Sequence, residues 1–249
     1  MKISILGNTN PGQVRTNNED YFILVPEFNL SIVADGMGGH NAGEVASEIT
    51  AKTIKEYFKE NFELLEHTTP CDFIKKAIRL ANRKVYQRAQ KNKEERGMGT
   101  TIVVTLIYNS KAYIGWVGDS RAYISRIDDN GKRFMSPIST DHSLVQEQIS
   151  DGLITQEDAD RYNIKDMITK AVGFTEDVEP SCKTIKSLKA GDTFMACSDG
   201  YYRYFSPKQI ADTFINTPIE LLADRMIKNA YDAGGEDNIT VATIKIEKL

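Results

Sequence analysis

The chain has 249 residues, 41% of them hydrophobic, which is enough to bury a sizeable core as one large domain or two small ones. Its formal net charge is -4, so nothing in its composition suggests a nucleic-acid-binding protein, which would need a basic face. No apolar run approaches the roughly 20 residues of a membrane-spanning helix, so we expect no membrane association. Residues 1–8 resemble a strand rather than a signal peptide.

The cysteines are few and widely spaced: Cys71, Cys182 and Cys197. Their odd number and the lack of a C-x-x-C pair argue against a disulfide framework or a zinc site. Unpaired cysteines favour a reducing compartment, so we expect a cytoplasmic protein. Cys197 lies in an apolar run and is expected in the core.

Short apolar or alternating runs, rich in Val, Ile, Tyr and Thr, predict β-strands along much of the chain. Turn residues such as Asn109-Ser110 join several of them as hairpins. The predicted strands are Ile3 to Leu6, Tyr21 to Val25, Leu30 to Ala34, Thr101 to Tyr108, Lys111 to Val117, Arg121 to Arg126, Thr193 to Ala196 and Ile239 to Ile246.

Helical periodicity interrupts the strands at four places, which are Ala42 to Glu60, Cys71 to Gln90, Pro207 to Phe214 and Pro218 to Ala233. Because several strands follow one another without a helix between them, the pattern favours antiparallel sheets with helices packed outside, an α+β fold. The polar stretch 143–180 is interpreted as an insertion packed on the main body, either a lid or ordinary surface structure.

Acidic residues recur beside small residues at the predicted strand ends. Asp35-Gly36, Asp199-Gly200 and Asp119-Ser120 each follow an apolar run. Glu19-Asp20 and Asp237-Asn238 each lead into one. One Asp-Gly after a strand is ordinary turn chemistry. Several are different, because strand ends can converge and converging carboxylates repel one another unless a cation neutralises them.

The predicted ligands are oxygen atoms, which select hard ions such as magnesium, manganese or calcium. Glycines beside the aspartates allow a backbone carbonyl to approach the ion. Two such ions about 3.5–4 Å apart can hydrolyse phosphate esters, because they acidify a bridging water and neutralise the phosphoryl charge. Arg15, just before the first acidic pair, suits bidentate binding of the phosphate.

Short motifs follow one another over essentially the whole chain. They are Arg15-Thr16-Asn17-Asn18-Glu19-Asp20, Val33-Ala34-Asp35-Gly36-Met37-Gly38-Gly39-His40, Gly99-Thr100-Thr101, Val117-Gly118-Asp119-Ser120-Arg121-Ala122-Tyr123, Asp141-His142-Ser143, Lys170-Ala171-Val172-Gly173, Ser198-Asp199-Gly200 and Asp237-Asn238-Ile239-Thr240. Each motif alone is weak, but the ordered set is specific. It resembles the metal-dependent protein serine/threonine phosphatases of the protein phosphatase 2C type, in their compact bacterial form.

This resemblance implies a four-layer α-β-β-α sandwich of two antiparallel sheets flanked by helices. It implies one domain over residues 1–249, with a mobile flap at about 143–180. The implied activity is hydrolysis of phosphoserine and phosphothreonine in proteins by direct attack of a metal-bridging water. The implied cofactors are two divalent cations, Mn²⁺ or Mg²⁺, with a weaker third. We expect a monomer whose partners are phosphorylated proteins and a cognate serine/threonine kinase.

The resemblance also assigns metal ligands. Asp35 would bridge the two metals, and the carbonyl of Gly36 would bind one of them. Asp199 and Asp237 would hold the other. Asp119, with Asp199, would hold the weaker third ion.

Further roles follow from the same resemblance. Glu19 and Asp20 would hold metal-bound waters or complete a ligand shell, and Arg15 would bind the substrate phosphate. His40 is a candidate proton donor to the leaving serine oxygen, or else a turn histidine bonded to the backbone. His142 is expected to be structural.

Three positions depart from the family pattern. Tyr201 replaces an aliphatic residue and opens the aromatic segment 201–205, Lys170 replaces an arginine, and Asn18-Glu19-Asp20 carries Glu where bacterial members often have Gln. None of these removes a predicted ligand. Tyr201 to Phe205 is interpreted as packing aromatics, or alternatively as a wall of the site or a docking surface.

Two alternative functions remain open from the sequence. One is a catalytically silent module on the same fold that binds phosphoproteins or a kinase. Such modules typically lose metal aspartates, which this chain keeps. The other is a hydrolase of small phosphate monoesters, because substrate specificity lies in loops.

Overall fold

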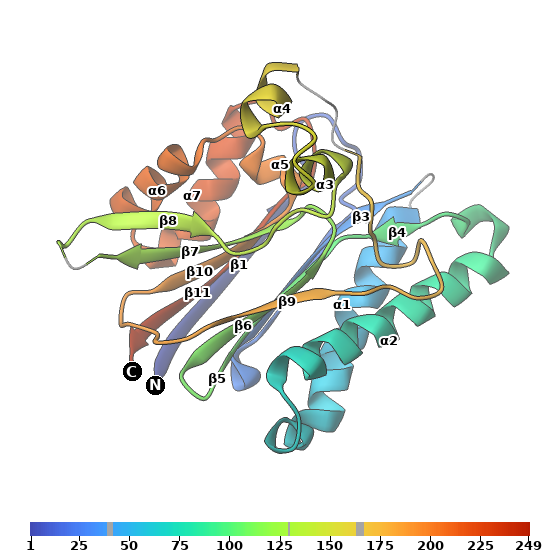
Figure 1. Cartoon of the computed structure of the whole chain (residues 1–249), viewed down its shortest axis with the longest axis horizontal. Coiled ribbons are helices and arrows are strands. Elements are labelled where there is room, and N and C mark those ends of the chain that lie inside the picture. The colour runs from blue at the N-terminus through green and yellow to red at the C-terminus, as the bar shows by residue number, and fades with distance from the viewer. Residues whose placement is uncertain (39–41, 129, 163–166) are drawn as a thin grey trace.

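Two antiparallel β-sheets form the centre of the molecule (Figure 1). The computed structural model describes the chain except residues 39–41, 129 and 163–166. One sheet contains, in spatial order, β1 (Lys2–Asn10), β11 (Ile239–Lys248), β10 (Thr193–Cys197), β7 (Arg121–Ile127) and β8 (Arg133–Pro137). The other contains β2 (Asp20–Val25), β3 (Leu30–Met37), β5 (Ile102–Tyr108), β6 (Lys111–Val117) and β9 (Ser181–Ile185), with β4 (Gly99–Thr100) paired to β3.

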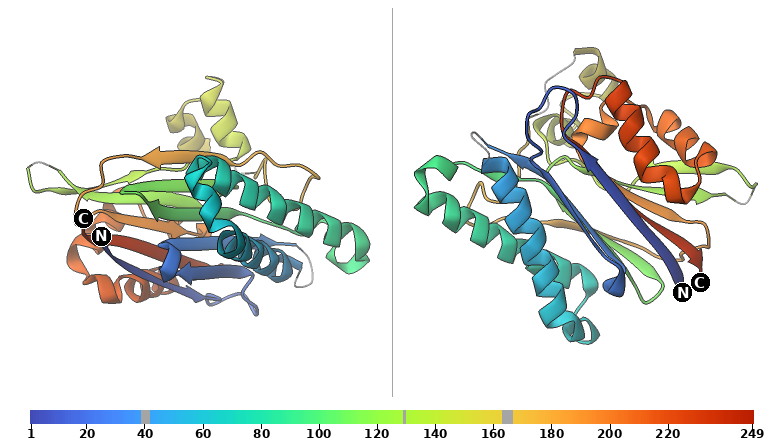
Figure 2. Two further views of the ribbon diagram at one scale, coloured as in Figure 1. Left: turned by 90° about the horizontal axis from the view of Figure 1, so that it is seen from below. Right: turned by 180° about the vertical axis from the view of Figure 1, so that it is seen from behind.

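Helices cover the outer face of each sheet (Figure 2). α1 (Ala42–Asn61) and α2 (Pro70–Lys91) pack on the β2–β9 sheet, and α6 (Pro207–Asn216) and α7 (Ile219–Asp232) lie on the β1–β8 sheet. None of the helices described is long and apolar enough to cross a membrane. The predicted four-layer α-β-β-α sandwich is confirmed.

The alternation of apolar residues along the strands explains the layers. Side chains on one face of each sheet meet in a core between the sheets, where Val33 and Ile114 from one sheet join Phe194 and Ile244 from the other. The opposite faces bury apolar side chains under the helices in two further clusters. Each sheet is therefore apolar on both faces, as the central layers of such a sandwich must be.

Local sequence signals begin the helices where expected. The Thr69 side chain accepts a hydrogen bond from the backbone N–H of Asp72, and Pro70 occupies the first helical position of α2. Ser206 and Gln209 form a reciprocal capping box at the start of α6. These caps satisfy backbone donors that a helix start leaves unpaired.

Two edge strands, β8 and β9, were missed by the sequence analysis. β8 is half-buried or exposed along its length, and β9 is half-buried except for one exposed residue. Each pairs with a neighbour on one side only. Edge strands of this kind lack the apolar alternation from which the other strands were predicted.

The stretch 143–180 contains α3 (Leu144–Ser150) and α4 (Gln156–Tyr162). Figure 1 shows these two helices together at one end of the sandwich, with both chain termini at the opposite end. Two isolated bridges, Ser143 to Ile168 and Thr100 to Val172, connect the stretch to itself and to β4. Its role as a flap stays a prediction.

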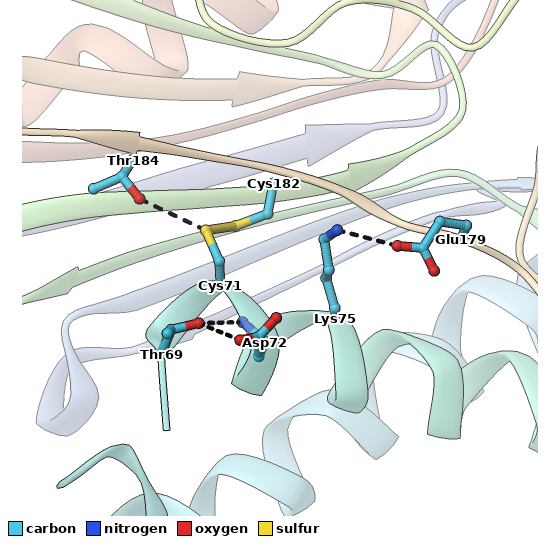
Figure 3. The surroundings of a disulfide bond; sticks show 7 residues. All are labelled: Thr69, Cys71, Asp72, Lys75, Glu179, Cys182 and Thr184. Carbon is cyan, nitrogen blue, oxygen red and sulfur yellow. Dashed lines mark hydrogen bonds and ion pairs between the residues drawn. A yellow bond between two sulfur atoms is a disulfide. The ribbon is translucent and has the colours of Figure 1, made fainter. Parts of the chain in front are cut away.

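Cys71 and Cys182 form a disulfide, with their Cα atoms 5.7 Å apart (Figure 3). It links the first turn of α2 to the edge strand β9 across 111 residues of sequence. The prediction of unpaired cysteines is therefore wrong for these two, and their part of the argument for a reducing compartment is removed. Long sequence separation conceals such a pair, because only the fold places β9 beside the start of α2. Cys197 is free and buried, as predicted.

Candidate active site

A pocket of about 260 Å³ lies at strand ends of both sheets and gathers most of the predicted site residues. Five carboxylates line it, together with a guanidinium and an exposed backbone turn. The lining residues are Arg15, Glu19, Asp35, Gly36, Met37, Gly38, Thr101, Asp119, Ile168, Asp199, Asp237 and Asn238. Ile168 comes from the stretch 143–180, so that stretch forms part of the wall. His40 lies outside the described residues.

Asp35 lines the pocket and Asp20 is buried behind it; we call this pair the deep side. The β2–β3 register pairs these two residues directly. The backbone of Asp35 is fixed by Thr101, whose N–H donates to the Asp35 carbonyl at 2.9 Å and whose Oγ1 accepts from the Asp35 N–H at 3.1 Å. A side chain on Gly36 would collide with the carbonyl of Gly43, 2.1 Å from an ideal Cβ, so this position requires glycine.

Ionisation of the carboxylates on the deep side is energetically unfavourable. Burial first, and then repulsion by Asp20, Asp199, Asp119 and Asp237, raises the pKa of Asp35 well above its usual range. The same four neighbours are the other predicted aspartates of the site. The carboxylates that the sequence placed at separate strand ends therefore converge on Asp35.

Asp20 lies behind Asp35 rather than in the pocket wall. It is 5% exposed, and its Oδ2 accepts a hydrogen bond from Ser198 Oγ at 2.7 Å. Its Oδ1 is buried without a hydrogen-bond partner in the part of the chain that the structure describes. Burial is the largest cause that raises the pKa of Asp20 to about 7, and the charges of Asp199 and Asp237 add to it. Glu19, not Asp20, faces the pocket.

The opposite side, which we call the rim side, consists of Asp199 and Asp237. Both side chains are 22% exposed, and both have arginine partners. Arg15 Nη2 donates to Asp237 Oδ2 at 2.9 Å, and Arg203 Nη2 donates to Asp199 Oδ2. Arg203 Nη1 also lies 3.9 Å from Asp237 Oδ2. Burial still raises the pKa of Asp199, although Arg203 opposes this shift.

Asn238 joins the rim side to the deep side. Its Oδ1 accepts from the backbone N–H of Glu19 at 2.8 Å, and its Nδ2 donates to the carbonyls of Pro11 and Asn17 at 3.0 and 2.9 Å. Its own N–H donates to Asp237 Oδ1 at 2.9 Å. One amide therefore fixes the two loops that carry Glu19 and Asp237.

Asp119 stands on the β6–β7 turn, which is fixed from two directions. The N–H of Gly118 donates to His142 Nδ1 at 3.1 Å, and the Gly118 carbonyl accepts from the His142 N–H at 2.9 Å. The hydroxyl of Tyr202 donates to the Asp119 carbonyl at 3.1 Å. His142 thus has the structural role that the sequence predicted.

The donor set of the pocket fits divalent cations. The available atoms are carboxylate and backbone oxygens, which hard ions prefer, and positive charge would relieve the repulsion around Asp35 and the unpaired Oδ1 of Asp20. Among the described residues, no three acidic, histidine or cysteine side chains stand close enough together to hold a metal ion by themselves. Mg²⁺ usually keeps several waters and takes only one or two carboxylates, so it does not need such a group.

Comparison with known proteins decides the family. The family model described as protein phosphatase 2C matches residues 13–231. The chain belongs to the protein phosphatase 2C family. The serine/threonine phosphatase stp of Listeria innocua is 33% identical over 241 residues, covering 95% of this chain and 93% of that protein. The protein phosphatase PhpP of Streptococcus pneumoniae is 32% identical over 252 residues, covering 100% and 98%.

Solved structures of serine/threonine phosphatases share the architecture over nearly the whole chain. The Mycobacterium tuberculosis serine/threonine phosphatase PstP/Ppp superimposes with a TM-score of 0.86 at 28% identity, covering 99% of both chains. The catalytic domain of PstP in complex with two manganese ions superimposes with a TM-score of 0.82 at 28% identity, again over 99% of both chains. Together, the family and these relatives confirm the predicted fold and the predicted phosphoprotein phosphatase activity.

Sequence reasoning missed several residues that build this protein phosphatase 2C site. Thr101 and Asn238 stood in the motifs but were given no role, and Arg203 was overlooked. Signals existed for two of them: Asn238 follows a predicted ligand, and Arg203 lies four residues after Asp199, the spacing of a helical ion pair. Residues of the segment 201–205 have different roles. Tyr201 is buried in the core, whereas the Tyr202 hydroxyl donates to the carbonyl of Asp119.

Proposed function

We propose that this phosphatase uses Asp35, the carbonyl of Gly36, Asp199 and Asp237 to hold two divalent cations, Mn²⁺ or Mg²⁺. Asp119, with Asp199, forms a weaker third site. The observation that carries this proposal is the convergence of carboxylates around Asp35, beside a guanidinium, in one open pocket. When bound, the two cations activate water and neutralise the charge of the phosphoryl group.

The side chains of this phosphatase then have distinct tasks. Asp35 and its neighbours supply negative charge at fixed positions, because strand pairing and Thr101 hold the backbone. Glu19 faces the pocket and accepts hydrogen bonds from water at the deep side. Arg15 is 52% exposed at the rim and can turn its planar fork toward a phosphate, which suits bidentate binding.

The substrates that we propose are proteins carrying phosphoserine or phosphothreonine. The pocket, with a volume of about 260 Å³, can admit a phosphorylated side chain while the peptide stays outside, and Ile168 offers an apolar contact beside it. Catalysis then depends mainly on positioning and electrostatic stabilisation of the phosphoryl group.

The test is a phosphothreonine peptide assayed with Mn²⁺, with Mg²⁺ and with a chelator, beside a panel of sugar phosphates. We expect metal-dependent release of phosphate from the peptide, at a kcat/KM well above that for the sugar phosphates. Preference for a sugar phosphate would overturn the protein substrate but not the metal assignment. Loss of metal dependence would overturn the assignment itself.

The proposal extends to partners and location. We place the protein in the cytoplasm, as a monomer that acts on the products of a serine/threonine kinase, because phosphoproteins are made where ATP-dependent kinases work. Cell fractionation tests the location, and light scattering tests the monomer. Recovery of the protein outside the cytoplasm would contradict the first, and a concentration-independent dimer mass would contradict the second.

A further inference from the structure

Arg203 lies where it can hold the same oxygens that a metal ion needs. α5 (Asp199–Tyr202) is a single turn that begins at Asp199, and the backbone N–H of Arg203 donates to the Asp199 carbonyl at 3.1 Å. This turn brings the two side chains to the same face, as expected for residues four apart. The Arg203 guanidinium binds Asp199 Oδ2 and lies 3.9 Å from Asp237 Oδ2.

Neighbouring tyrosines fix the backbone on both sides of Arg203. Tyr202 donates its hydroxyl to the Asp119 carbonyl, and its ring lies 3.8 Å from the Arg121 guanidinium. The hydroxyl of Tyr204 accepts from the backbone N–H of Glu236, next to Asp237, at 2.9 Å. The segment therefore touches all three loops that carry Asp119, Asp199 and Asp237, and its position relative to them is fixed.

The Arg203 side chain, in contrast, has room to move. The Arg203 side chain is 40% exposed. The contacts of Tyr202 and Tyr204 hold the main chain on either side of Arg203 and do not restrain its guanidinium. A partly exposed ion pair contributes modestly to stability and exchanges readily. The guanidinium can therefore leave Asp199 and Asp237 when a stronger cation competes for their oxygens.

We propose that Arg203 is a positioning residue that competes with the metal ion for Asp199 and Asp237 and thereby sets the metal affinity of the site. The inference rests on the metal assignment proposed above. The arginine neutralises the rim carboxylates in the metal-free protein, which stabilises the fold, and it must give up its bond to Asp199 when metal binds. Its remaining positive charge also repels the incoming cation.

The experiment is calorimetric titration of Mn²⁺ into the chelator-treated full chain, with Arg203→Gln, Arg203→Lys and a matched control. The control is Arg83→Gln, which removes an exposed arginine from α2, where Arg83 pairs with Asp177 at 3.7 Å. We expect Arg203→Gln to bind Mn²⁺ about three- to tenfold more tightly than wild type. Arg203→Lys, which keeps the charge but lacks the planar fork, should tighten binding about twofold. Arg83→Gln should match wild type.

A second readout is the melting temperature without and with saturating Mn²⁺. In chelator, Arg203→Gln should melt at a lower temperature than wild type. Its melting temperature should rise more on adding Mn²⁺, because a metal that binds the folded state more tightly stabilises it more. Unchanged or weaker Mn²⁺ binding in Arg203→Gln would overturn the inference. If that variant fails to fold, wild-type affinity in Arg203→Lys would overturn it. Absence of Mn²⁺ binding by the wild type would instead overturn the metal assignment.

Discussion

The deep and rim sides of the pocket solve the same electrostatic problem differently. Asp20 and Asp35 are held by strand pairing and hydroxyl contacts, and the contacts described for them include no cationic side chain. Asp199, at the start of α5, and Asp237, in the loop before β11, are more exposed and pair with Arg203 and Arg15. Burial raises the pKa of Asp20 and Asp35, while arginine opposes the shift at Asp199.

This difference teaches how charge is assigned within one site. On the proposed metal assignment, the deep side would rely on a bound cation, and strand pairing holds its backbone in place. The rim side has arginine partners within the chain, so on the same proposal it would adjust metal affinity and contact the substrate. Variants of the deep side should therefore lower turnover. Variants of the rim side should change the affinity for metal or substrate.

The largest expected effect comes from Asp35→Asn on the deep side. It removes the carboxylate on which the others converge, so phosphopeptide turnover at saturating Mn²⁺ should fall by about 10³-fold or more. The metal-free protein should melt at a higher temperature than wild type, because a repelled charge is gone. A phosphate-release assay measures the turnover rate, and thermal melts with chelator measure the stability of the metal-free protein. Asp212→Asn, on the exposed face of α6, is the control and should change neither. A near-normal rate in Asp35→Asn would contradict the proposed role of the deep side in catalysis.

The disulfide tests whether the pocket is independent of the rest of the scaffold. A Cys71→Ser, Cys182→Ser double variant should lose about 2–4 kcal/mol of unfolding free energy, because it no longer closes a long loop. Its Mn²⁺ affinity should stay within about twofold of wild type, since α2 and β9 contribute no lining residue to the pocket. Denaturant unfolding with and without reductant checks this. Reductant should destabilise wild type and leave the double variant unchanged; equal sensitivity of both would contradict the pairing.

Arg15→Ala addresses the substrate role of the rim side. Loss of a charge-assisted bidentate contact should raise KM for a phosphopeptide about 10- to 100-fold. The Mn²⁺ dissociation constant should change by less than about threefold, because Arg15 is exposed and its described ion pair is with Asp237 at the rim. Arg15→Lys should recover part of the loss. A parallel loss of metal and substrate binding would show that Arg15 serves the metal site instead.

The sequence predicted most of this arrangement, and the failures have physical reasons. Strands such as β5 and β6 carry continuous apolar runs between turn residues, so they could be located. The edge strands β8 and β9 bury less and left no such pattern. Asp35 and Gly36 were proposed as ligands only through the ordered set of motifs, because a single aspartate beside glycine after a strand is ordinary turn chemistry.

Contacts between distant segments could not be predicted in the same way. Cys71 and Cys182 are separated by 111 residues, and no spacing rule pairs them. Asn238 acts through loops at the other end of the chain, so its role depends on the packing of β1 against β11. Arg203 was detectable only after α5 was recognised, and a helix of four residues leaves no periodic signal.

His142 links the turn that carries Asp119 to the edge strand β9. Its Nδ1 accepts from the Gly118 N–H beside Asp119, and its Nε2 lies 2.9 Å from Ser181 Oγ on β9. Its ring stacks on Trp116. Burial first, and then the charge of Lys170, lowers the pKa of His142 from 6.5 to about 4.

The smallest expected effect follows from this shifted pKa. Between about pH 6.5 and pH 4 the unfolded chain binds a proton at His142 that the folded chain does not, so the folded state loses stability as the pH falls through this window. Above pH 6.5 the contribution is fully present. Because the ring is partly exposed, we expect only about 1 kcal/mol. His142→Asn keeps an acceptor for Gly118 but cannot titrate, so urea unfolding of this variant should depend less on pH between 6.5 and 4 than that of wild type. Identical slopes would show that the folded and unfolded chains bind a proton at His142 equally, which would contradict the lowered pKa.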